Sequence, residues 1–354
     1  MSNMRFTGSG TWQRNFLIAL CTFLAVLLVV LAFGTAFVHN LLNKIGRFDQ
    51  DDLYTLSQSE AENITDDLLG TIDPDSTVTL PDIGDVVIPT GPSNLPEKHG
   101  NHVINILLVG QDRRPGEGRQ RSDSMMMITV NTVQNTITLT SFMRDQYVQI
   151  PGYKNNKLNA AYAFGGFNLL NATLKQNFGV YVDYNFEVDF DGFIDIINML
   201  GGVEINLTKE EADYINYHHG LKLSPGIQFL GGYEALQYSR IRAIDSDYRR
   251  AERQRTVLLS ILNRYKSKSV DEMLVILKQM LPMITTDMTN DQILSLAGQL
   301  LPMVATAKIN TLRIPVEGTF QHGDVQVREG LKNWFQYNID FDTNRAVLQE
   351  LFAK

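Results

Sequence analysis

The chain of 354 residues has a single cysteine, Cys21, so no disulfide can form within it. It also has no internal repeat and no low-complexity tract, which argues against solenoid and fibrous architectures. Basic residues are absent from one long stretch, since residues 49–97 hold 12 aspartates and glutamates but no lysine or arginine. The other residues carry 27 acidic and 31 basic side chains, so the net charge of −8 combines an acidic segment with a mildly basic remainder.

Charge is also absent from residues 16–38, a run of 23 mostly apolar residues. About 20 apolar residues in a helix cross the hydrocarbon core of a bilayer. We therefore predict a transmembrane helix rather than a cleaved signal peptide, whose apolar region has about 7 to 15 residues. Lysine and arginine counts on the two flanks are even, so the positive-inside rule gives only a weak indication of the orientation of the helix in the membrane. Because the tail of residues 1–15 is short, we expect it in the cytoplasm and the rest outside the cell, as a single-pass protein of the cell membrane.

Residues 39–100 are acidic and interrupted by proline and glycine, a composition typical of an extracytoplasmic linker. Residues 101–354 are long enough for one large domain. In its first part, β-rich runs alternate with helical patterns, which predicts an α/β fold with a mixed central β-sheet flanked by helices on both faces. Strands are expected at residues 103–110, 124–131, 135–141, 184–190 and 203–207, and helices at 158–178 and 191–200. The second part is predicted to be mostly helical, at residues 232–240, 247–266, 270–281, 290–303 and 328–352, with one strand at 309–314.

Two aspartates flank one loop between two predicted strands. Asp112 follows the first strand, and Asp123 directly precedes the second. Carboxylates that project into a common space are the hard oxygen ligands that Mg²⁺ prefers, with a substrate phosphate completing the coordination. Taken alone, however, two loop aspartates are more often solvated turn or capping residues.

Six arginines occur within residues 240–255. This stretch predicts a helix that begins at Ser246 or Asp247, since both are good N-caps. On that helix Asp247, Arg250 and Gln254 share one face, and Arg253 lies about 60° further round. Arginine suits a phosphate ligand because its planar guanidinium donates two N–H groups to one phosphate and does not lose its proton.

The alternative to a phosphate-binding role for this stretch is a solvent-exposed face with ion pairs such as Arg249 with Glu252. Nucleic acid is not expected as a partner, because the domain is placed outside the cell and lacks a strongly basic balance. A further arginine, Arg144, follows the predicted strand at 135–141. The ends of strands are where α/β proteins build their sites, although a generic surface arginine is equally compatible with this position.

Seven sequence blocks occur in a fixed order and resemble the LytR-CpsA-Psr (LCP) family of membrane-anchored cell-wall enzymes. The blocks are GQDRR, RSDSMM, SFMRD followed after four residues by IPG, KLNAAYAFGG, GGVEINL, LGGYEALQYSRIR and DSDYRRAERQ. They cover residues 101–265, and we expect the tail to residue 354 to complete the domain. The resemblance implies a phosphotransferase that moves a glycopolymer, such as teichoic acid or capsule, from an undecaprenyl-diphosphate carrier to peptidoglycan. The bond formed would be a phosphodiester to a sugar hydroxyl.

The resemblance also implies roles for individual residues. Asp112 and Asp123 would hold Mg²⁺, or Mn²⁺ in its place. The groups expected to bind the diphosphate are Arg144, Arg240, Arg242, Arg250, Arg253 and Gln254. Asp247 would position the arginines or the acceptor, and it is also a candidate general base. Arg114 and Arg121 match motif positions more loosely, as substrate-binding residues.

This sequence departs from the family pattern at two places. Phe142-Met143 stands where the family usually has Ile-Pro, and this difference would loosen the turn that carries Arg144. Arg249 stands where a glycine often precedes the helix arginine, so it either adds a donor to the site or faces solvent.

A polyprenyl carrier also needs an apolar slot. Tyr162 and Phe167 of the helix at 158–178, and the segment 186–193, are candidates to line it, although such side chains are more often plain core. Two other functions remain open from the sequence. The first is a polyprenyl-diphosphate hydrolase, which would use water as the acceptor. The second is a non-catalytic cell-wall adaptor or regulator, although the tail of residues 1–15 is too short for a helix-turn-helix.

Overall fold

The structure is a computed structural model. It describes residues 38–47, 100–111, 121–153, 155–266, 272, 275–276, 279–304, 306–328 and 331–353. The chain divides into two units, residues 1–45 and 46–354, and the described part of the first is helical at residues 38–42. None of the helices described is long and apolar enough to span a bilayer. Residues 16–37 of the predicted membrane segment, and most of the predicted linker, lie outside the described residues.

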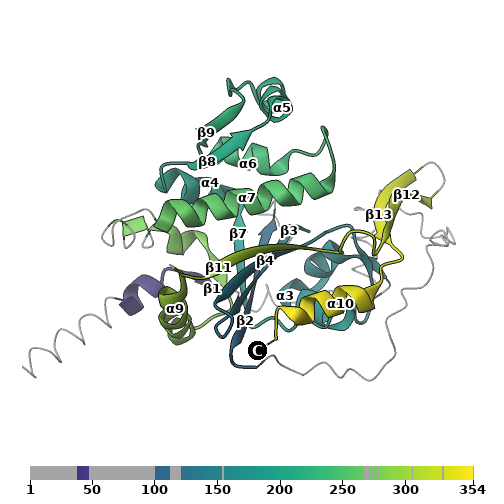
Figure 1. The fold of residues 1–354 in the computed structure, drawn as a ribbon, viewed down its shortest axis with the longest axis horizontal. Coiled ribbons are helices and arrows are strands. Elements are labelled where there is room, and N and C mark those ends of the chain that lie inside the picture. The colour runs from purple at the N-terminus through teal and green to yellow at the C-terminus, as the bar shows by residue number, and fades with distance from the viewer. Residues whose placement is uncertain are drawn as a thin grey trace, which may run out of the picture. The chain divides into compact units, whose positions relative to one another are not determined.

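A mixed sheet of seven strands forms the centre of residues 46–354, in the order β1-β10-β7-β2-β3-β4-β11 (Figure 1). Its strands are β1 (Gly46–Arg47), β10 (Thr285–Thr286), β7 (Tyr184–Asp189), β2 (Val103–Gln111), β3 (Ser122–Asn131), β4 (Thr136–Phe142) and β11 (Lys308–Ile314). Neighbouring strands β2, β3 and β4 are antiparallel, whereas β7 pairs parallel with β2 and β11 parallel with β4. The predicted mixed α/β sheet is therefore confirmed.

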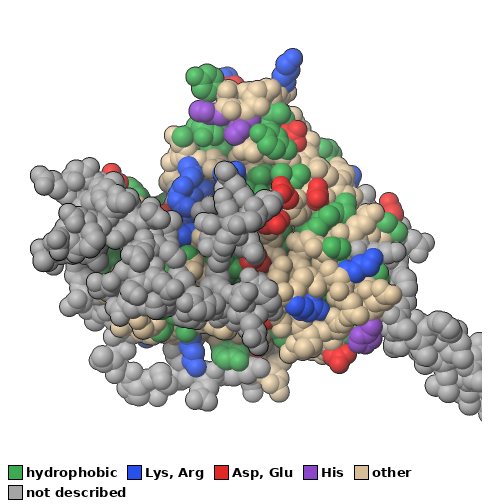
Figure 2. All heavy atoms as spheres, turned by 180° about the vertical axis from the view of Figure 1, so that it is seen from behind, with side chains coloured by type: hydrophobic (Ala, Val, Ile, Leu, Met, Phe, Trp, Pro, Cys, Tyr) green, Lys and Arg blue, Asp and Glu red, His purple; other side chains and the backbone are tan. Residues whose placement is uncertain are grey.

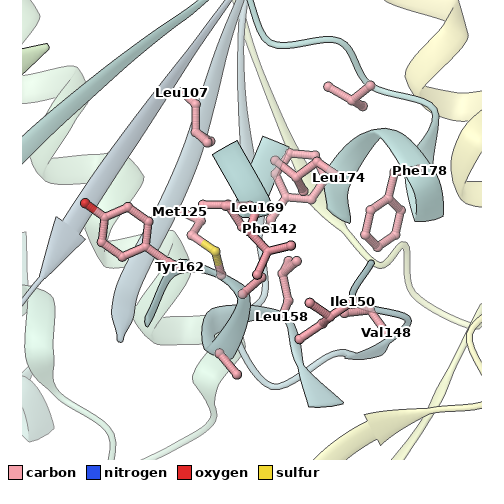
Figure 3. Close-up of a cluster of buried hydrophobic side chains, with 14 of the residues drawn as sticks. Leu107, Met125, Phe142, Val148, Ile150, Leu158, Tyr162, Leu169, Leu174 and Phe178 are labelled. Atoms are coloured by element: carbon pink, nitrogen blue, oxygen red, sulfur yellow. The ribbon is translucent and has the colours of Figure 1, made fainter. Parts of the chain in front are cut away.

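Successive side chains of each strand point to opposite faces of the sheet, and apolar side chains are buried on both faces. On one face, Leu107 of β2 and Met125 of β3 pack against α3 (Leu158–Phe178), and α10 (Phe341–Glu350) joins the same core (Figure 3). On the other face, Ile106 of β2 packs near α9 (Asn290–Val304), and further along the same strands lie α4 (Phe190–Met199) and α7 (Asp247–Lys266). Helices thus cover both faces, as the sequence pattern predicts.

Helix α3 has the predicted bounds but is not regular throughout. Gly165 and Gly166 leave helical geometry, and Gly166 has a φ of 57°, which a residue with a Cβ rarely adopts. The helix ends at Gly179, whose left-handed conformation lets its N–H bond to the carbonyl of Lys175.

A small lobe follows α4 in the chain. It contains β8 (Val203–Leu207), α5 (Lys209–His219), β9 (Gly226–Leu230) and α6 (Gly232–Arg240). Strand β8 occurs where it is predicted, but it pairs only with β9 and does not belong to the central sheet. Sequence analysis did not anticipate α5 or β9. Figure 2 shows hydrophobic and histidine side chains exposed at the top of the molecule, over this lobe, where Tyr217 is 86% exposed.

The prediction of a helix over residues 328–352 is wrong in its first half. Strands β12 (Gln321–Arg328) and β13 (Leu331–Tyr337) form an antiparallel hairpin, and α10 begins only at Phe341. Buried Phe335 and exposed Trp334 are neighbours on β13, which fits the two-residue period of a strand. Asn338, with a φ of 50°, ends the strand, and Asp340 caps α10 through a bond from the Thr343 N–H to its carboxylate. Three further elements are short: β5 (Tyr147–Val148), β6 (Asn156–Lys157) and the 3₁₀ helix η1 (Leu281–Met283).

The start of α6 lies directly against the backbone of α4. The N–H of Gly232 donates to the side-chain oxygen of Asn198 at 2.8 Å. A Cβ at position 232 would lie 2.1 Å from the carbonyl oxygen of Ile194, a distance that no real contact reaches. Only glycine therefore permits this approach of the two helices.

We expect Gly232→Ala to lower the free energy of unfolding by about 1–3 kcal/mol, because the added methyl forces α6 away from α4. Denaturant unfolding of the purified chain measures this change. Gly298→Ala is the matched control on α9, since its new Cβ would meet no atom within 4 Å. It should leave stability unchanged or raise it by about 0.5–1 kcal/mol. Equal losses in the two variants would contradict the assigned contact.

Candidate functional site

A cavity of about 380 Å³ lies between the sheet and helices α4, α6 and α7. Most of its wall is apolar, contributed by Leu108, Met126, Phe186, Val188, Phe190, Phe193, Ile196, Leu236, Val257, Leu258, Ile261 and Met280. Its polar lining consists of Ser124, Asp189, Ser239, Arg240, Arg242, Arg250 and Gln254. The cavity therefore combines an apolar body with a group of three guanidinium side chains.

The arginines reach the cavity because the end of α6 and the start of α7 are joined by a short connection. Arg240 is the last residue of α6, Arg242 lies in the connection, and Arg250 is one turn into α7. The guanidinium of Arg240 lies 4.7 Å from the ring centre of Phe190 on α4, a cation–π contact. Arg240 and Arg242 are exposed, whereas Arg250 is only 6% exposed.

Gln254 joins α7 to the central sheet at this cavity. Its side-chain oxygen accepts a hydrogen bond from the Ser124 hydroxyl of β3 at 3.1 Å. A second bond, from Arg255 to the Ser141 hydroxyl of β4 at 2.9 Å, ties the neighbouring position of α7 to the next strand. Arg240, Arg242, Arg250 and Gln254 are thus brought together, as the sequence predicts, beside strand β3.

Arg253 occupies a different position from the one predicted. It is 4% exposed and does not line the cavity. Its Nε donates to Glu211 of α5 at 2.7 Å, while its Nη1 donates to the carbonyl of Ile241 and to Asp245, both at 3.2 Å, and its Nη2 also contacts Asp245. Burial alone lowers the pKa of Arg253, but the hydrogen bonds with Asp245 and Glu211 outweigh it and raise that pKa. Arg253 therefore positions the α6–α7 connection, which carries Arg242, rather than facing a ligand.

A second charged group lies where β4 ends; we name it the strand-end cluster, comprising Arg121, Arg144, Asp145 and Lys157. Asp145 accepts from the Nε of Arg144 at 3.3 Å and from the Nζ of Lys157 at 2.7 Å. The pKa of Lys157 is lowered mainly by burial, opposed by Asp145 and assisted by the positive charges of Arg144 and Arg121. Two cations therefore contact the carboxylate of Asp145, and the charge of Arg121 is close enough to act on Lys157.

The strand-end cluster adjoins the cavity through strand β3. Arg121 directly precedes that strand, and Ser124, three residues later, lines the cavity. Sequence analysis missed Lys157, although it opens the block KLNAAYAFGG and precedes α3 directly. No local pattern identified it, because its partner Asp145 lies 12 residues earlier in the sequence.

The structure corrects the prediction that Tyr162 and Phe167 line a lipid slot. Their rings pack edge to face at 5.0 Å within the core under the opposite face of the sheet, where Figure 3 labels Tyr162. The hydroxyl of Tyr162 donates to Glu187 of β7. Because neighbours on a strand face opposite sides, Phe186 and Val188 point into the cavity instead. The segment 186–193, the other predicted candidate, does line it.

The remaining predicted residues are placed as follows. Arg249 is exposed and forms an ion pair with Glu252 at 2.8 Å, so it faces solvent. Asp112 and Arg114 lie outside the described residues. Asp123 and Asp247 are described as part of β3 and as the first residue of α7, but their side chains are not. Within the described ranges, no three histidine, cysteine, aspartate or glutamate side chains gather as a metal site.

Together, the fold and the site define an α/β domain with an apolar cavity that carries a group of arginines. Residues 79–339 match the model of the LytR_cpsA_psr family. The chain therefore belongs to the LytR_cpsA_psr family.

Several known proteins are similar to this chain. It is 37% identical over 193 residues to "Polyisoprenyl-teichoic acid--peptidoglycan teichoic acid transferase TagU" of Bacillus mycoides (strain KBAB4), covering 53% of this chain and 62% of that protein. It is 38% identical over 161 residues to "Regulatory protein MsrR" of Staphylococcus aureus (strain COL), covering 45% and 48%. The solved structure of TagT bound to LIIa-WTA is similar with a TM-score of 0.59 and 27% identity, over 75% of this chain and 97% of that one. The chain thus spans less than two thirds of the length of these two curated relatives.

We expect Arg253→Ala to lower the free energy of unfolding by about 3–5 kcal/mol, because it leaves the buried carboxylate of Glu211 without its partner. Arg249→Ala is the matched control on the same helix, since its ion pair is exposed and contributes about 0–1 kcal/mol. Denaturant unfolding compares the two variants. A loss for Arg253→Ala no larger than that of the control would show that the buried network is not needed for stability.

Proposed function

We propose that the protein is an extracytoplasmic phosphotransferase that attaches a glycopolymer from an undecaprenyl-diphosphate carrier to peptidoglycan through a phosphodiester bond. One observation carries this proposal: an apolar cavity that has Arg240, Arg242, Arg250 and Gln254 together in its wall. A ligand that matches both parts is a lipid with a multiply charged anionic head. The names of the similar TagU proteins, and the complex of TagT with LIIa-WTA, support the same substrate class.

The apolar wall accounts for the lipid part of the donor. Its side chains come from β2, β3, β7, α4, α6 and α7, so the slot is formed only when the helices pack on the sheet. At about 380 Å³ the cavity is at the small end of ligand sites, which run from about 300 to 1000 Å³. It therefore binds the part of a long polyprenyl chain that lies next to the diphosphate.

The arginines account for the diphosphate. Guanidinium groups donate paired hydrogen bonds to phosphate oxygens, and Arg250 presents its guanidinium from a buried position in the cavity wall. Phosphoryl transfer needs positioning and charge neutralisation more than covalent help from the protein. Gln254, held by Ser124, adds a neutral group whose orientation is already fixed.

The proposed reaction exchanges one phosphorus–oxygen bond for another. A sugar hydroxyl of peptidoglycan attacks the phosphorus that bears the glycopolymer, and the bond from that phosphorus to the bridging oxygen breaks. Undecaprenyl phosphate leaves with the bridging oxygen and its electron pair, and the arginines stabilise its negative charge. The hydroxyl proton passes to a carboxylate, for which Asp247 at the start of α7 is the candidate general base.

A divalent cation, Mg²⁺ or Mn²⁺, belongs to this proposal. Asp123 is part of β3 between Ser122 and Ser124, where the β2–β3 register shifts, and Asp112 follows the end of β2. Because Gln111 pairs with Ser122, Asp123 lies where β2 ends, and Asp112 is the next residue in the sequence after Gln111. Two carboxylates with phosphate oxygens fit a hard cation. When bound, the ion would neutralise phosphate charge beside the arginines.

The proposal includes anchoring in the cell membrane by residues 16–38, with the domain outside the cell. Anchoring raises the effective concentration of the enzyme near a substrate that is itself confined to the bilayer.

We expect Arg242→Ala and Arg250→Lys each to reduce transfer by about 100-fold, because each removes donors to the charged transition state. Arg249→Lys is the matched control on α7 and should retain full transfer, since its side chain pairs with Glu252 at the surface. The assay joins a lipid-linked glycopolymer to peptidoglycan with the purified full chain in detergent. Free polymer phosphate in place of the joined product would instead indicate a hydrolase, and unchanged transfer in both variants would refute the assigned site.

Chelation of divalent metal by EDTA should suppress transfer, and added Mg²⁺ or Mn²⁺ should restore it. Asp123→Asn should raise the metal concentration needed for half-maximal transfer, because it removes one anionic ligand. Direct metal binding, measured by calorimetry with the same variant, provides a readout independent of turnover. Full transfer in metal-free buffer would contradict the carboxylate assignment.

A further inference from the structure

Four aromatic rings form a connected surface outside the cavity, which we name the aromatic platform: Tyr248, Phe320, His322 and Trp334. Tyr248 lies in the first turn of α7, and the other three lie on or just before the β12–β13 hairpin. The ring centres of His322 and Trp334 are 5.2 Å apart at an angle of 31°, and Phe320 is 5.8 Å from His322 and 5.9 Å from Tyr248. Segments separated by some 70 residues or more of chain thus build one surface.

Most of the platform is accessible to solvent, and Phe320 also packs against the core that contains α3. Trp334 is 39% exposed, His322 is exposed, and Tyr248 and Phe320 are half-buried. Phe335, the neighbour of Trp334 on the same strand, is only 1% exposed and packs on the other side of the hairpin against Tyr147 and Lys157. On β13, Phe335 therefore packs in the core, whereas the Trp334 ring remains accessible to a ligand.

Polar groups with defined positions surround the rings. The guanidinium of Arg313 lies 4.0 Å from the ring centre of Tyr248 and is paired with Glu317 at 2.6 Å. Asp324 is exposed and lies directly opposite Trp334 in the hairpin register. Gln336 is 1% exposed and donates to the Tyr248 hydroxyl at 3.4 Å, while its side-chain oxygen has no hydrogen-bond partner among the described residues.

We infer that the aromatic platform binds a neutral saccharide, and that this saccharide is the glycan strand that accepts the polymer. Aromatic rings stack on the C–H faces of sugar rings, while carboxylate, amide and guanidinium groups bond to the sugar hydroxyls. Both kinds of group are present here, on a rigid hairpin and at the start of α7. The inference rests on the proposed function for the role of this saccharide as acceptor.

Charge favours the acceptor glycan over the transferred polymer. Among the side chains described here, Arg313 is neutralised by Glu317, and Asp324 adds a negative charge. A phosphate-rich polymer requires the opposite balance, as the cavity arginines provide.

Position also connects the platform to the site. Tyr248 precedes Arg250 by two residues on α7, and the backbone N–H of Gln336 donates to the carbonyl of Asp145 in the strand-end cluster at 2.9 Å. The platform is thus joined to Arg250 through the first turn of α7, and to the strand-end cluster through β13.

Trp334 offers a direct binding test, because the chain has only one other tryptophan, Trp12. In a Trp12→Phe background, the full chain in detergent micelles should show a saturable change in Trp334 emission with the N-acetylglucosamine tetramer. An oligomer of glycerol phosphate should cause no such change. No response to the tetramer would overturn the inference, and a response to the glycerol phosphate oligomer alone would overturn the assignment to the acceptor.

Kinetics provide the second test. Trp334→Ala should raise the KM for the glycan acceptor by about fivefold to tenfold and leave the KM for the lipid-linked donor unchanged, as expected for one lost aromatic contact. Trp334→Phe should retain most of the affinity. The matched control is Tyr217→Ala, another exposed aromatic residue on α5, which should change neither constant. An equal rise in both KM values, or a rise in the control, would refute a dedicated acceptor site.

The two proposals fail separately. If the tetramer changes Trp334 emission but no polymer is joined to peptidoglycan, the saccharide site stands and the transferase assignment is wrong. If transfer proceeds with an acceptor KM that Trp334→Ala does not change, the transferase assignment stands and the platform has no role in acceptor binding.

Discussion

The geometry of the site depends on one buried ion-pair network, in which Arg253 holds two carboxylates. Like charges repel one another, so the approach of Arg240, Arg242 and buried Arg250 to one cavity depends on the backbone between them being held in place. Arg253 fixes it by bonding to Glu211 of the small lobe, to Asp245 of the α6–α7 connection and to the carbonyl of Ile241. The small lobe is therefore a structural support for the connection between α6 and α7 as well as a wall of the cavity. The remaining repulsion among the arginines is relieved when an anion binds, which gives the site a preference for multiply charged ligands.

Much of the fold could be predicted from the sequence, because strong local patterns decide it. Strands β2, β3 and β4 are continuous β-rich runs separated by short connections, and the bounds of α3 and α6 follow from their apolar patterns and flanking glycines. Local patterns predict a strand poorly where its pairing with a distant segment decides whether it forms. Strand β8 has a clear pattern, yet β9, its partner among the described strands, is a five-residue segment with one glycine and two exposed apolar residues. The segment that forms β13 resembles a helix in composition, and only its pairing with β12 makes it a strand.

The site residues could be predicted from the sequence where the face of a helix on which a residue lies decides what its side chain contacts. Arg250 and Gln254 share one face of α7, and both face the cavity. Arg253, one position before Gln254, faces the small lobe, because its partner Glu211 lies 42 residues earlier and no local pattern reveals it. Lys157 was missed for the same reason. Tyr162 and Phe167 were assigned to the wrong face, since an apolar helix between sheet and solvent looks the same whichever side of the sheet it covers.

Strand β7 has one side in the cavity and the other in the core that contains α3. Phe186 and Val188 form part of the cavity wall, while Glu187 between them accepts the Tyr162 hydroxyl beneath the sheet. Exchanges at the first two positions would change the width of the slot and also the packing beside it, because Phe186 contacts the core under α9 and Val188 contacts the buried cluster beside α4. Under the proposed function, the thickness or saturation of the carrier that the slot accepts would depend on these two side chains, whereas Glu187 between them contacts a different set of neighbours.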